Sequence, residues 1–343
     1  MGDRVRADDD VRRTLVAAIA TLVVACAGPP AAAPPSPRVS AAVGLRATFV
    51  LANPEGLVGL DGQGKTLGKI VDLPPQSAPS SPALDPARTS LVYAVLLQRD
   101  PVRGFGSDIE VVNLDGTGRH ALIQHENDNV FYSNPRFDST GNIVYVHRTE
   151  GLIQGGTYIG NVDTIERLDV RTGLRQKILT DAGDFTITPA GDTIIYAHLN
   201  QGLPDDLWRA SIDGTGATPF FKTKDHWFYL QSPRIGPTGC QVAFSAAGHT
   251  SSRAAPGLIG GPSRLGQAHL GIPSDLDVVP CDGTSVRVIG STVDDVDPAW
   301  SPSGAEIAYA GTGGLFTIDI ASGSIRTLAQ GQTFFFGSLV WLR

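Results

Sequence analysis

Cysteine is scarce in this sequence, with three residues in a chain of 343. Three cysteines are too few for a disulfide-framed mini-protein or for an all-cysteine zinc site. Basic side chains are also in deficit, because 27 Lys and Arg stand against 34 Asp and Glu, for a net charge of −7. Since nucleic-acid binders neutralise phosphates with Lys and Arg, we expect no nucleic-acid partner.

Long hydrophobic runs are missing as well. No apolar stretch reaches the 18 positions that a membrane-spanning helix needs. The longest, Leu15–Ala25 near the N-terminus, is eleven residues long. Arg12 and Arg13 precede this run, and small residues follow it. A basic flank, a short apolar centre and a small-residue cleavage region are typical of a secretory signal, which we expect over residues 1–25.

The end of this segment predicts how the mature protein is held. Val23–Cys26 resembles a bacterial lipobox, in which the cysteine is lipidated and becomes the new N-terminus, so Cys26 is the predicted lipid attachment. The alternative is a plain signal peptide with an incidental cysteine. Residues 26–44 are rich in Pro and Ala and would form an extended tether. We therefore expect an exported lipoprotein, anchored on the extracytoplasmic side, in the periplasm or at the cell surface.

One cassette recurs through the rest of the chain. A Pro-containing loop and a turn lead into two β-branched residues, an aromatic and a small residue, with some substitutions, beginning at Ser81, Asn134, Asp184, Ser232 and Asp297. Each copy is followed by two further short β-type segments, separated by Asp-Gly or related pairs that suit tight hairpins. No long helical periodicity occurs after residue 45, so the sequence predicts an all-β fold.

An incomplete sixth unit stands at the front. Segments starting at Phe49, Leu57 and Leu67 match the second, third and fourth strands of the repeat, and the missing first strand matches Ser338–Arg343. The pattern therefore predicts six four-stranded units over residues 45–343, closed when the C-terminal strand joins the first unit.

The repeat resembles a known family. The segment Pro298-Ala-Trp-Ser-Pro-Ser-Gly-Ala-Glu-Ile-Ala-Tyr, with Asp319-Ile-Ala-Ser-Gly after it, is similar to the repeat of TolB-type six-bladed β-propellers. The resemblance implies a propeller of four-stranded antiparallel blades. TolB itself carries an α/β domain before its propeller, and the residues ahead of the repeats here are too few for it, so the resemblance is to the TolB-like propeller only.

In such a propeller, the loops between strands 2 and 3 share one face with the loops between blades. This sequence places its longest connections between strands 2 and 3, at 98–107, 148–162 and 246–274, including an insertion over 247–273 in the fifth blade. A loop of that length is functional or disordered. Charged and aromatic residues of the inter-blade loops are ligand-binding candidates on this face: His125, Asp128, Tyr132, Asp225, His226, Trp227, Asp294, Asp295 and Asp297.

Each candidate has a second interpretation. Asp and His at these positions also suit turns and strand starts, where they accept hydrogen bonds from free backbone N–H groups. The three aspartates at 294–297 lack the glycine and spacing of an EF-hand loop, so no metal is predicted. No cofactor-binding motif occurs either.

The remaining two cysteines are predicted to pair. In the last unit, residues 305–310 should pair antiparallel with 315–320, and Cys240 and Cys281 occupy the positions equivalent to Ala305 and Ile320. Facing cysteines in an exported protein favour a disulfide, which would clamp the base of the insertion. The alternative is two buried thiols aligned by chance.

Three functions remain open. The first is a monomeric binding module for an envelope protein, peptide or glycan, which uses the loop-rich face. The second is a propeller enzyme, a hydrolase or lyase built around His125, His226 and the 294–297 group. No G-x-S-x-G, H-E-x-x-H, C-x-x-C or P-loop pattern supports it, but propeller enzymes have scattered site residues. The third is a scaffold whose insertion docks a neighbouring envelope protein.

Overall fold

The computed structural model describes residues 43–54, 56–221, 227–249, 273–331 and 337–343. The predicted signal peptide, Cys26 and nearly all of the predicted tether lie outside these ranges, as do Asp225, His226 and most of the predicted insertion. Among the described residues, no helix is long and apolar enough to cross a membrane. Apart from one four-residue helix, α1 (Val43–Arg46), their regular structure is β-strand, so the fold is all-β as predicted.

The C-terminal strand joins the first sheet. This sheet contains β24, β1, β2 and β3, with bounds Ser338–Trp341, Phe49–Asn53, Gly56–Leu60 and Thr66–Asp72. β24 pairs antiparallel with β1 and places Leu339 opposite Leu51. The predicted closure by the C-terminal strand is therefore confirmed, and it covers an edge of β1 that could otherwise pair with another chain.

The next residues form one eight-stranded sheet. Its strands are β4 (Ser77–Leu84), β5 (Ser90–Asp100), β6 (Gly104–Asn113), β7 (His120–Ile123), β8 (Val130–Phe137), β9 (Ile143–Gln154), β10 (Thr157–Asp169) and β11 (Arg175–Thr180). Pairing is antiparallel throughout, except where β6 and β8 run parallel over two residue pairs, Gly106 with Val130 and Ser107 with Phe131. The two halves of this sheet are thus joined by a very short parallel contact.

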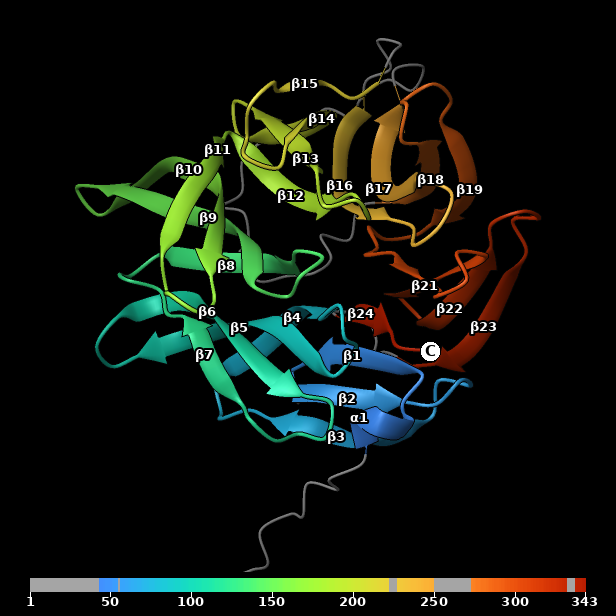
Figure 1. Cartoon of the computed structure of the whole chain (residues 1–343), viewed down its shortest axis with the longest axis horizontal. Coiled ribbons are helices and arrows are strands. Elements are labelled where there is room, and N and C mark those ends of the chain that lie inside the picture. The colour runs from blue at the N-terminus through green and yellow to red at the C-terminus, as the bar shows by residue number, and fades with distance from the viewer. Residues whose placement is uncertain (1–42, 55, 222–226, 250–272, 332–336) are drawn as a thin grey trace, which may run out of the picture. The chain divides into compact units, whose positions relative to one another are not determined.

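Three further four-stranded antiparallel sheets follow along the chain. They comprise β12 (Ala182–Ile187), β13 (Thr193–Asn200), β14 (Leu203–Ser211) and β15 (Thr218–Pro219); β16 (Trp227–Ile235), β17 (Gln241–His249), β18 (Ser274–Pro280) and β19 (Arg287–Thr292); and β20 (Ala299–Trp300), β21 (Glu306–Gly311), β22 (Gly314–Asp319) and β23 (Ile325–Gln330). The sheets stand around a common centre in a propeller arrangement, with β24 beside β4 and β1 (Figure 1).

The core lies between neighbouring sheets. Phe221, after β15, contacts Trp227 at the start of β16 and Phe244 in β17, with ring centroids 4.8 and 5.9 Å apart. All three rings are buried. Burial of such a side chain contributes on the order of 1.5–3 kcal/mol, so these aromatic contacts hold adjacent sheets together.

Glycine in the hairpin turns lets the sheets approach closely. Gly214 (φ +85°) and Gly283 (φ +70°) follow an aspartate in turns between the third and fourth strands. A Cβ at Gly214 would lie 2.2 Å from the carbonyl oxygen of Ile178, and one at Gly283 would lie 2.0 Å from that of Phe220. The turn conformation and the contact with the neighbouring sheet therefore both require glycine.

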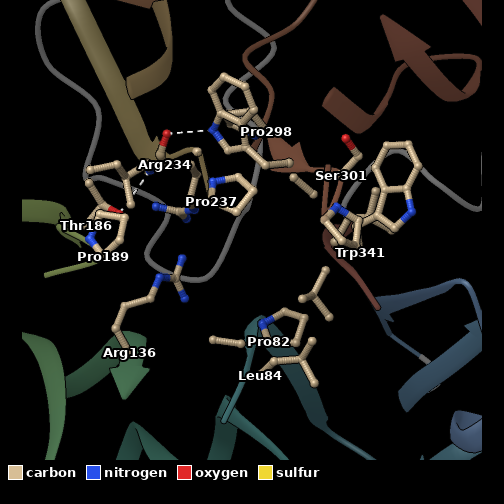
Figure 2. Close-up of a pocket in the computed structure, with 18 of the residues that line it drawn as sticks. Pro82, Leu84, Arg136, Thr186, Pro189, Arg234, Pro237, Pro298, Ser301 and Trp341 are labelled. Carbon is tan, nitrogen blue, oxygen red and sulfur yellow. Dashed lines mark hydrogen bonds between the residues drawn. The ribbon is translucent and has the colours of Figure 1, made fainter. Parts of the chain in front are cut away.

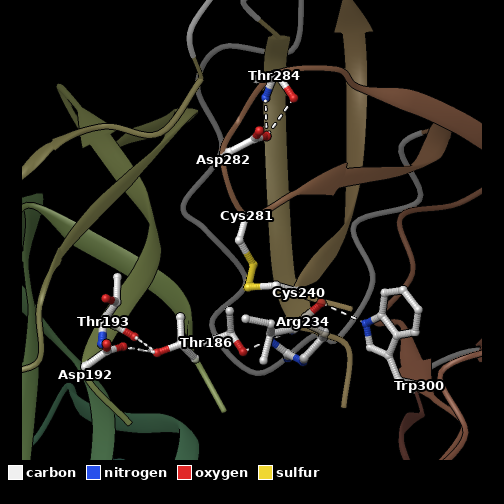
Figure 3. Close-up of a disulfide and its surroundings, with 11 residues drawn as sticks. Thr186, Asp192, Thr193, Arg234, Cys240, Cys281, Asp282, Thr284 and Trp300 are labelled. Atoms are coloured by element: carbon white, nitrogen blue, oxygen red, sulfur yellow. Dashed lines mark hydrogen bonds between the residues drawn. A yellow bond between two sulfur atoms is a disulfide. The ribbon is translucent and has the colours of Figure 1, made fainter. Parts of the chain in front are cut away.

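The predicted disulfide is present. The register of the last sheet pairs Glu306 with Asp319, as the sequence alignment requires. In the preceding sheet Cys240 and Cys281 are bonded, with Cα atoms 5.3 Å apart, and the Cys281 N–H donates to the Cys240 carbonyl at 2.9 Å (Figure 3). The bridge joins β17 and β18 at the ends remote from the predicted insertion, so it does not clamp the insertion's base directly.

Two of the predicted long connections are strands. Residues 98–107 and 148–162 contribute to paired strands: β5 and β6 continue to a turn at 101–103, and β9 and β10 continue to Gly155 and Gly156. Positive φ angles at the two glycines allow the tight reversal. Long hairpins therefore replace the irregular loops that the sequence predicts.

The fold also begins slightly before the predicted boundary at residue 45. Val43 is buried with Ile70 and Leu114 in one core cluster. A Cβ on Gly44 would lie 2.2 Å from the Leu114 carbonyl oxygen. These two residues of the predicted tether thus pack against the sheets.

Candidate functional site

His125, the first predicted site residue, lies in a buried polar network before β8. Its Nδ1 is 2.6 Å from Asp108 Oδ1, which also accepts the His125 backbone N–H at 2.9 Å. Arg103 donates to both oxygens of Asp108 at 3.1 Å. The His125 side chain is fully buried. A ligand outside the protein would therefore have no direct access to this imidazole.

Asp128 and Tyr132 hold neighbouring segments in place. Asp128 Oδ1 accepts the backbone N–H of Phe105 at 2.9 Å and so fixes the start of β6. The Tyr132 hydroxyl donates to Glu126 at 2.7 Å, and Arg175 binds both groups. Burial and the contact with Glu126 raise the pKa of Tyr132, so its hydroxyl remains a donor. Both side chains thus already have structural partners.

The three predicted aspartates before β20 are buried, and each is held by a different group. Asp294 Oδ2 accepts from Thr312 at 3.3 Å, and Asp295 Oδ2 accepts from Gln231 at 2.5 Å. Asp297 forms an ion pair with Arg234 at 2.8 Å. Trp227, another predicted site residue, is buried in the aromatic core described above.

The structure therefore distributes the predicted residues among separate networks. Asp225 and His226 lie outside the described residues. In the described parts of the chain, no three His, Cys, Asp or Glu side chains gather as metal ligands. A polar pocket of about 170 Å³ does lie near the N-terminal ends of β12 and β16. Its lining includes His147, Thr149, Asn161, Asp163, Asp184, Tyr229 and Gln231.

Sequence reasoning missed the polar relay beside this pocket. His147 Nε2 is 2.9 Å from Asp163 Oδ1, and His147 Nδ1 is 3.3 Å from Ser133 Oγ. Thr149 donates to the same Asp163 oxygen at 2.6 Å. With a proton on Nε2 directed to Asp163, Nδ1 can accept the Ser133 hydroxyl proton, which is the order of contacts that a nucleophilic serine needs.

A larger cavity, of about 310 Å³, lies at the opposite ends of the central strands. It is lined by the C-terminal residues of six strands, namely β4, β8, β12, β16, β20 and β24, and by the turns after several of them. Prolines, aliphatic side chains and the indoles of Trp300 and Trp341 make up most of the wall. Figure 2 shows Pro82, Leu84, Pro237, Pro298 and Trp341 around the open space. Most of the predicted candidates lie before or near the N-terminal ends of β8, β16 and β20, away from this cavity. Asp297 is the exception, because its partner Arg234 lines the cavity.

Two arginines enter this apolar cavity. Arg136 of β8 and Arg234 of β16 occupy equivalent positions in the repeat, and each donates back to the carbonyl of the preceding proline, at 2.8 and 2.9 Å. Arg234 is also paired with Asp297 at 2.8 Å. In the described part of the chain Arg136 has no carboxylate partner within ion-pair distance. Figure 2 shows its guanidinium directed into the open space between the strands.

The environment of Arg136 is unfavourable for a cation. Burial lowers the pKa of Arg136 from 12.5 to about 9, and repulsion from Arg234 adds to this, while Asp297 and Asp184 partly offset it. A pKa near 9 still leaves the group charged at neutral pH. A positive charge in a low-dielectric cavity without a bound carboxylate favours an anionic ligand.

One position of the repeat in the sequence could have indicated this cavity. The corresponding positions in the other repeats are Ala83, Thr186, Ala299 and Val340, all small or apolar. A long basic side chain at this position in only two of the copies departs from the repeat, and that departure marks Arg136 and Arg234 as candidates for a role other than packing.

Comparisons with known proteins agree with the architecture. No protein-family model and no curated protein matches the sequence. Among solved structures, TolB from Acinetobacter baumannii matches with a TM-score of 0.59 at 18% identity, over 86% of this chain and 65% of that one. The chain is a β-propeller. A chain of Kuenenia stuttgartiensis hydrazine synthase matches with a TM-score of 0.61 at 10% identity, over 86% of this chain and 47% of that chain.

A chain in the crystal structure of a nidogen/laminin complex is similar as well, with a TM-score of 0.59 at 10% identity, over 85% of this chain and 97% of that chain. The match to TolB covers 65% of the TolB chain, so this protein spans less than two thirds of the length of TolB. At these identities the likeness shows the fold alone, because unrelated functions share propeller folds. The TolB-like resemblance of the repeat is supported at the level of the fold.

Proposed function

We propose that this protein is an exported, lipid-anchored, six-bladed β-propeller that acts as a binding module in the cell envelope. Its ligand, part of a protein, a peptide or a glycan, enters the cavity at the C-terminal ends of the central strands. The observation that carries this proposal is the 310 Å³ cavity, to which six strands from all parts of the repeat region contribute. Ligand pockets of about 300–1,000 Å³ with apolar walls and a few polar groups are typical of proteins.

The contacts of the central strands support six blades. β24 contacts β4, β4 contacts β8, and the series continues through β12, β16 and β20 back to β24. The eight-stranded sheet counts as two blades in this scheme, because only the two parallel residue pairs between β6 and β8 join its halves.

Export is supported by the predicted signal peptide and by the disulfide. Cys240 and Cys281 are bonded across β17 and β18. Structural disulfides persist in oxidising compartments outside the cytoplasm. The lipobox-like Val23–Cys26 segment supports the lipid anchor.

The binding role is tested by filling the cavity. Leu84 and Ile235 line it and are partly exposed, so Leu84→Trp and Ile235→Trp should narrow it without rebuilding the core. Each purified protein is incubated with envelope extract, and the retained peptides, glycans and small molecules are identified by mass spectrometry. Ile153→Trp, on the exposed end of β9, is the matched control. We expect species that wild type and control retain and both filled variants lose; identical retention by all four proteins would contradict the proposal.

An enzyme is the second candidate, and the contact of Ser133 with His147 and Asp163 favours it. A fluorophosphonate probe should label Ser133 if this relay activates the hydroxyl, and His147→Ala should abolish labelling. Absence of labelling in the folded wild-type protein would remove this candidate. Of the residues that the sequence predicts for catalysis, namely His125, His226 and the 294–297 group, His125 is bonded to Asp108 and Asp297 is paired with Arg234.

A further inference from the structure

The charges that face the cavity are unbalanced. Arg88, Arg136 and Arg234 line it, the described residues of its wall include no carboxylate, and the carboxylate paired with one of the three is Asp297, 2.8 Å from Arg234. Arg88 is exposed at the rim and donates to the Leu342 carbonyl. Arg136 and Arg234 set against Asp297 leave one positive charge in excess inside the cavity, and the excess falls at Arg136, which has no ion-pair partner among the described residues.

The donors of Arg136 are also available. A guanidinium has five N–H groups in a planar fork, and only one contact of Arg136, with the Pro135 carbonyl at 2.8 Å, is made by the protein's described residues. The fork matches the two oxygens of a carboxylate. A phosphate monoester would bring nearly two negative charges to a site with an excess of one, so a singly charged carboxylate fits better.

The walls indicate what the carboxylate is attached to. Trp300 and Trp341 line the cavity together with Pro82, Pro237 and Pro298. Gly236 brings the backbone against the Trp300 ring, since a Cβ there would lie 3.3 Å from the ring atoms. Aromatic and proline surfaces bury apolar groups, and a volume of about 310 Å³ is at the small end for ligand pockets. Such a space suits a small organic acid or the last residue or two of a peptide.

We propose that Arg136 binds the carboxylate of a ligand whose apolar part packs against Trp300, Trp341 and the prolines of the cavity. This inference rests on the proposed function, because it assumes that the cavity is the binding site. Arg234 assists as a positioned second cation, held by Asp297 at 2.8 Å and by the Pro233 carbonyl at 2.9 Å. The carboxylate can come from a free organic acid or from the C-terminus of a peptide.

The test uses matched pairs of probes. Binding of 3-phenylpropionate is compared with that of 3-phenylpropionamide, and binding of N-acetyl-Ala-Phe with a free carboxylate is compared with that of its C-terminal amide, by titration calorimetry and tryptophan fluorescence. Two of the four tryptophans of the chain line the cavity, so occupancy should change the emission. We expect at least one carboxylate to bind about tenfold or more tightly than its amide. The better pair identifies the source of the carboxylate.

Variants distinguish the contribution of the Arg136 charge to binding from that of the cavity's apolar space. Arg136→Gln should weaken carboxylate binding at least about tenfold and leave amide binding unchanged, and Arg136→Lys should restore part of the loss. Arg171→Gln removes the same charge from an exposed turn residue that does not line the cavity and should have no effect. Equal binding of acids and amides, both lost in Leu84→Trp, would overturn the carboxylate inference and leave the binding cavity intact. If no probe binds to the wild type, the carboxylate inference is overturned. The retention experiment described above then shows whether the cavity is a binding site.

Discussion

Replacing Arg136 with methionine is expected to stabilise the folded protein, whereas the same substitution at Arg234 is expected to destabilise it. The two arginines occupy equivalent positions in the repeat and enter the same cavity. They differ in one contact, because Arg234 is paired with the buried Asp297 at 2.8 Å and Arg136 has no such partner in the described chain. The pair therefore provides its own matched control.

The magnitude follows from the pKa of Arg136. A fall from 12.5 to about 9 corresponds to roughly 5 kcal/mol against the charged form, at about 1.4 kcal/mol for each pKa unit. Because this pKa is lowered on folding, the destabilisation is complete at every pH below about 9 and diminishes only above it. Partial exposure to the cavity reduces the value, and we expect Arg136→Met to raise the free energy of unfolding by about 1–4 kcal/mol at pH 7.

Arg234→Met leaves the Asp297 carboxylate buried without its cation, which typically lowers stability by about 3–5 kcal/mol. Urea unfolding followed by tryptophan fluorescence and by far-UV circular dichroism measures both changes. Thermal unfolding should shift in the same directions, by about 2–4 °C for each kcal/mol. A loss of more than about 1 kcal/mol of stability in Arg136→Met would contradict this prediction, because it would mean that Arg136 is a structural residue with a partner in the fold.

Three further predictions concern other parts of the chain. The Cys240→Ser, Cys281→Ser double variant should lose about 4 kcal/mol of stability, because the bridge closes a 41-residue separation, and non-reducing mass spectrometry should show the link in the wild type. Burial raises the pKa of Asp277 to about 7, helped by Asp275, so stability should fall as pH rises from about 4 to 7. Asp277→Asn should remove this dependence in pH-dependent urea unfolding, and an unchanged profile would contradict it. Cys26→Ser should release the protein from membranes on fractionation, whereas continued retention would contradict lipidation.

The repeat predicted the fold because its signals are local. In four of the copies the turn after the central strand starts with an Asp, Thr or Ser that accepts a backbone N–H group, as Asp138 does from Asn142 and Ile143 at 3.0 Å. The same turn, between β8 and β9, also needs a residue with positive φ, which is Gly141 (φ +74°). Because these local signals recur along the chain, the alignment also placed Cys240 opposite Cys281 and β24 beside β1.

The candidate site was harder to predict, because it depends on contacts between distant segments. Charged loop residues such as Asp128 and Asp295 look like ligand-binding groups in sequence, yet they bind Phe105 and Gln231. The cavity is built from strand ends more than 250 residues apart, such as Leu84 and Trp341. Its key residue, Arg136, sits inside the repeat and differs from its equivalents only in side-chain type.

Binding of a carboxylate at Arg136 is tested by a crystal structure of the protein with 3-(4-bromophenyl)propionate. We expect an anomalous bromine peak within the cavity near Trp300 and Trp341, and carboxylate density within hydrogen-bond distance of the Arg136 guanidinium. Bromine confined to the polar pocket around His147, with nothing at Arg136 under saturating conditions, would contradict this expectation.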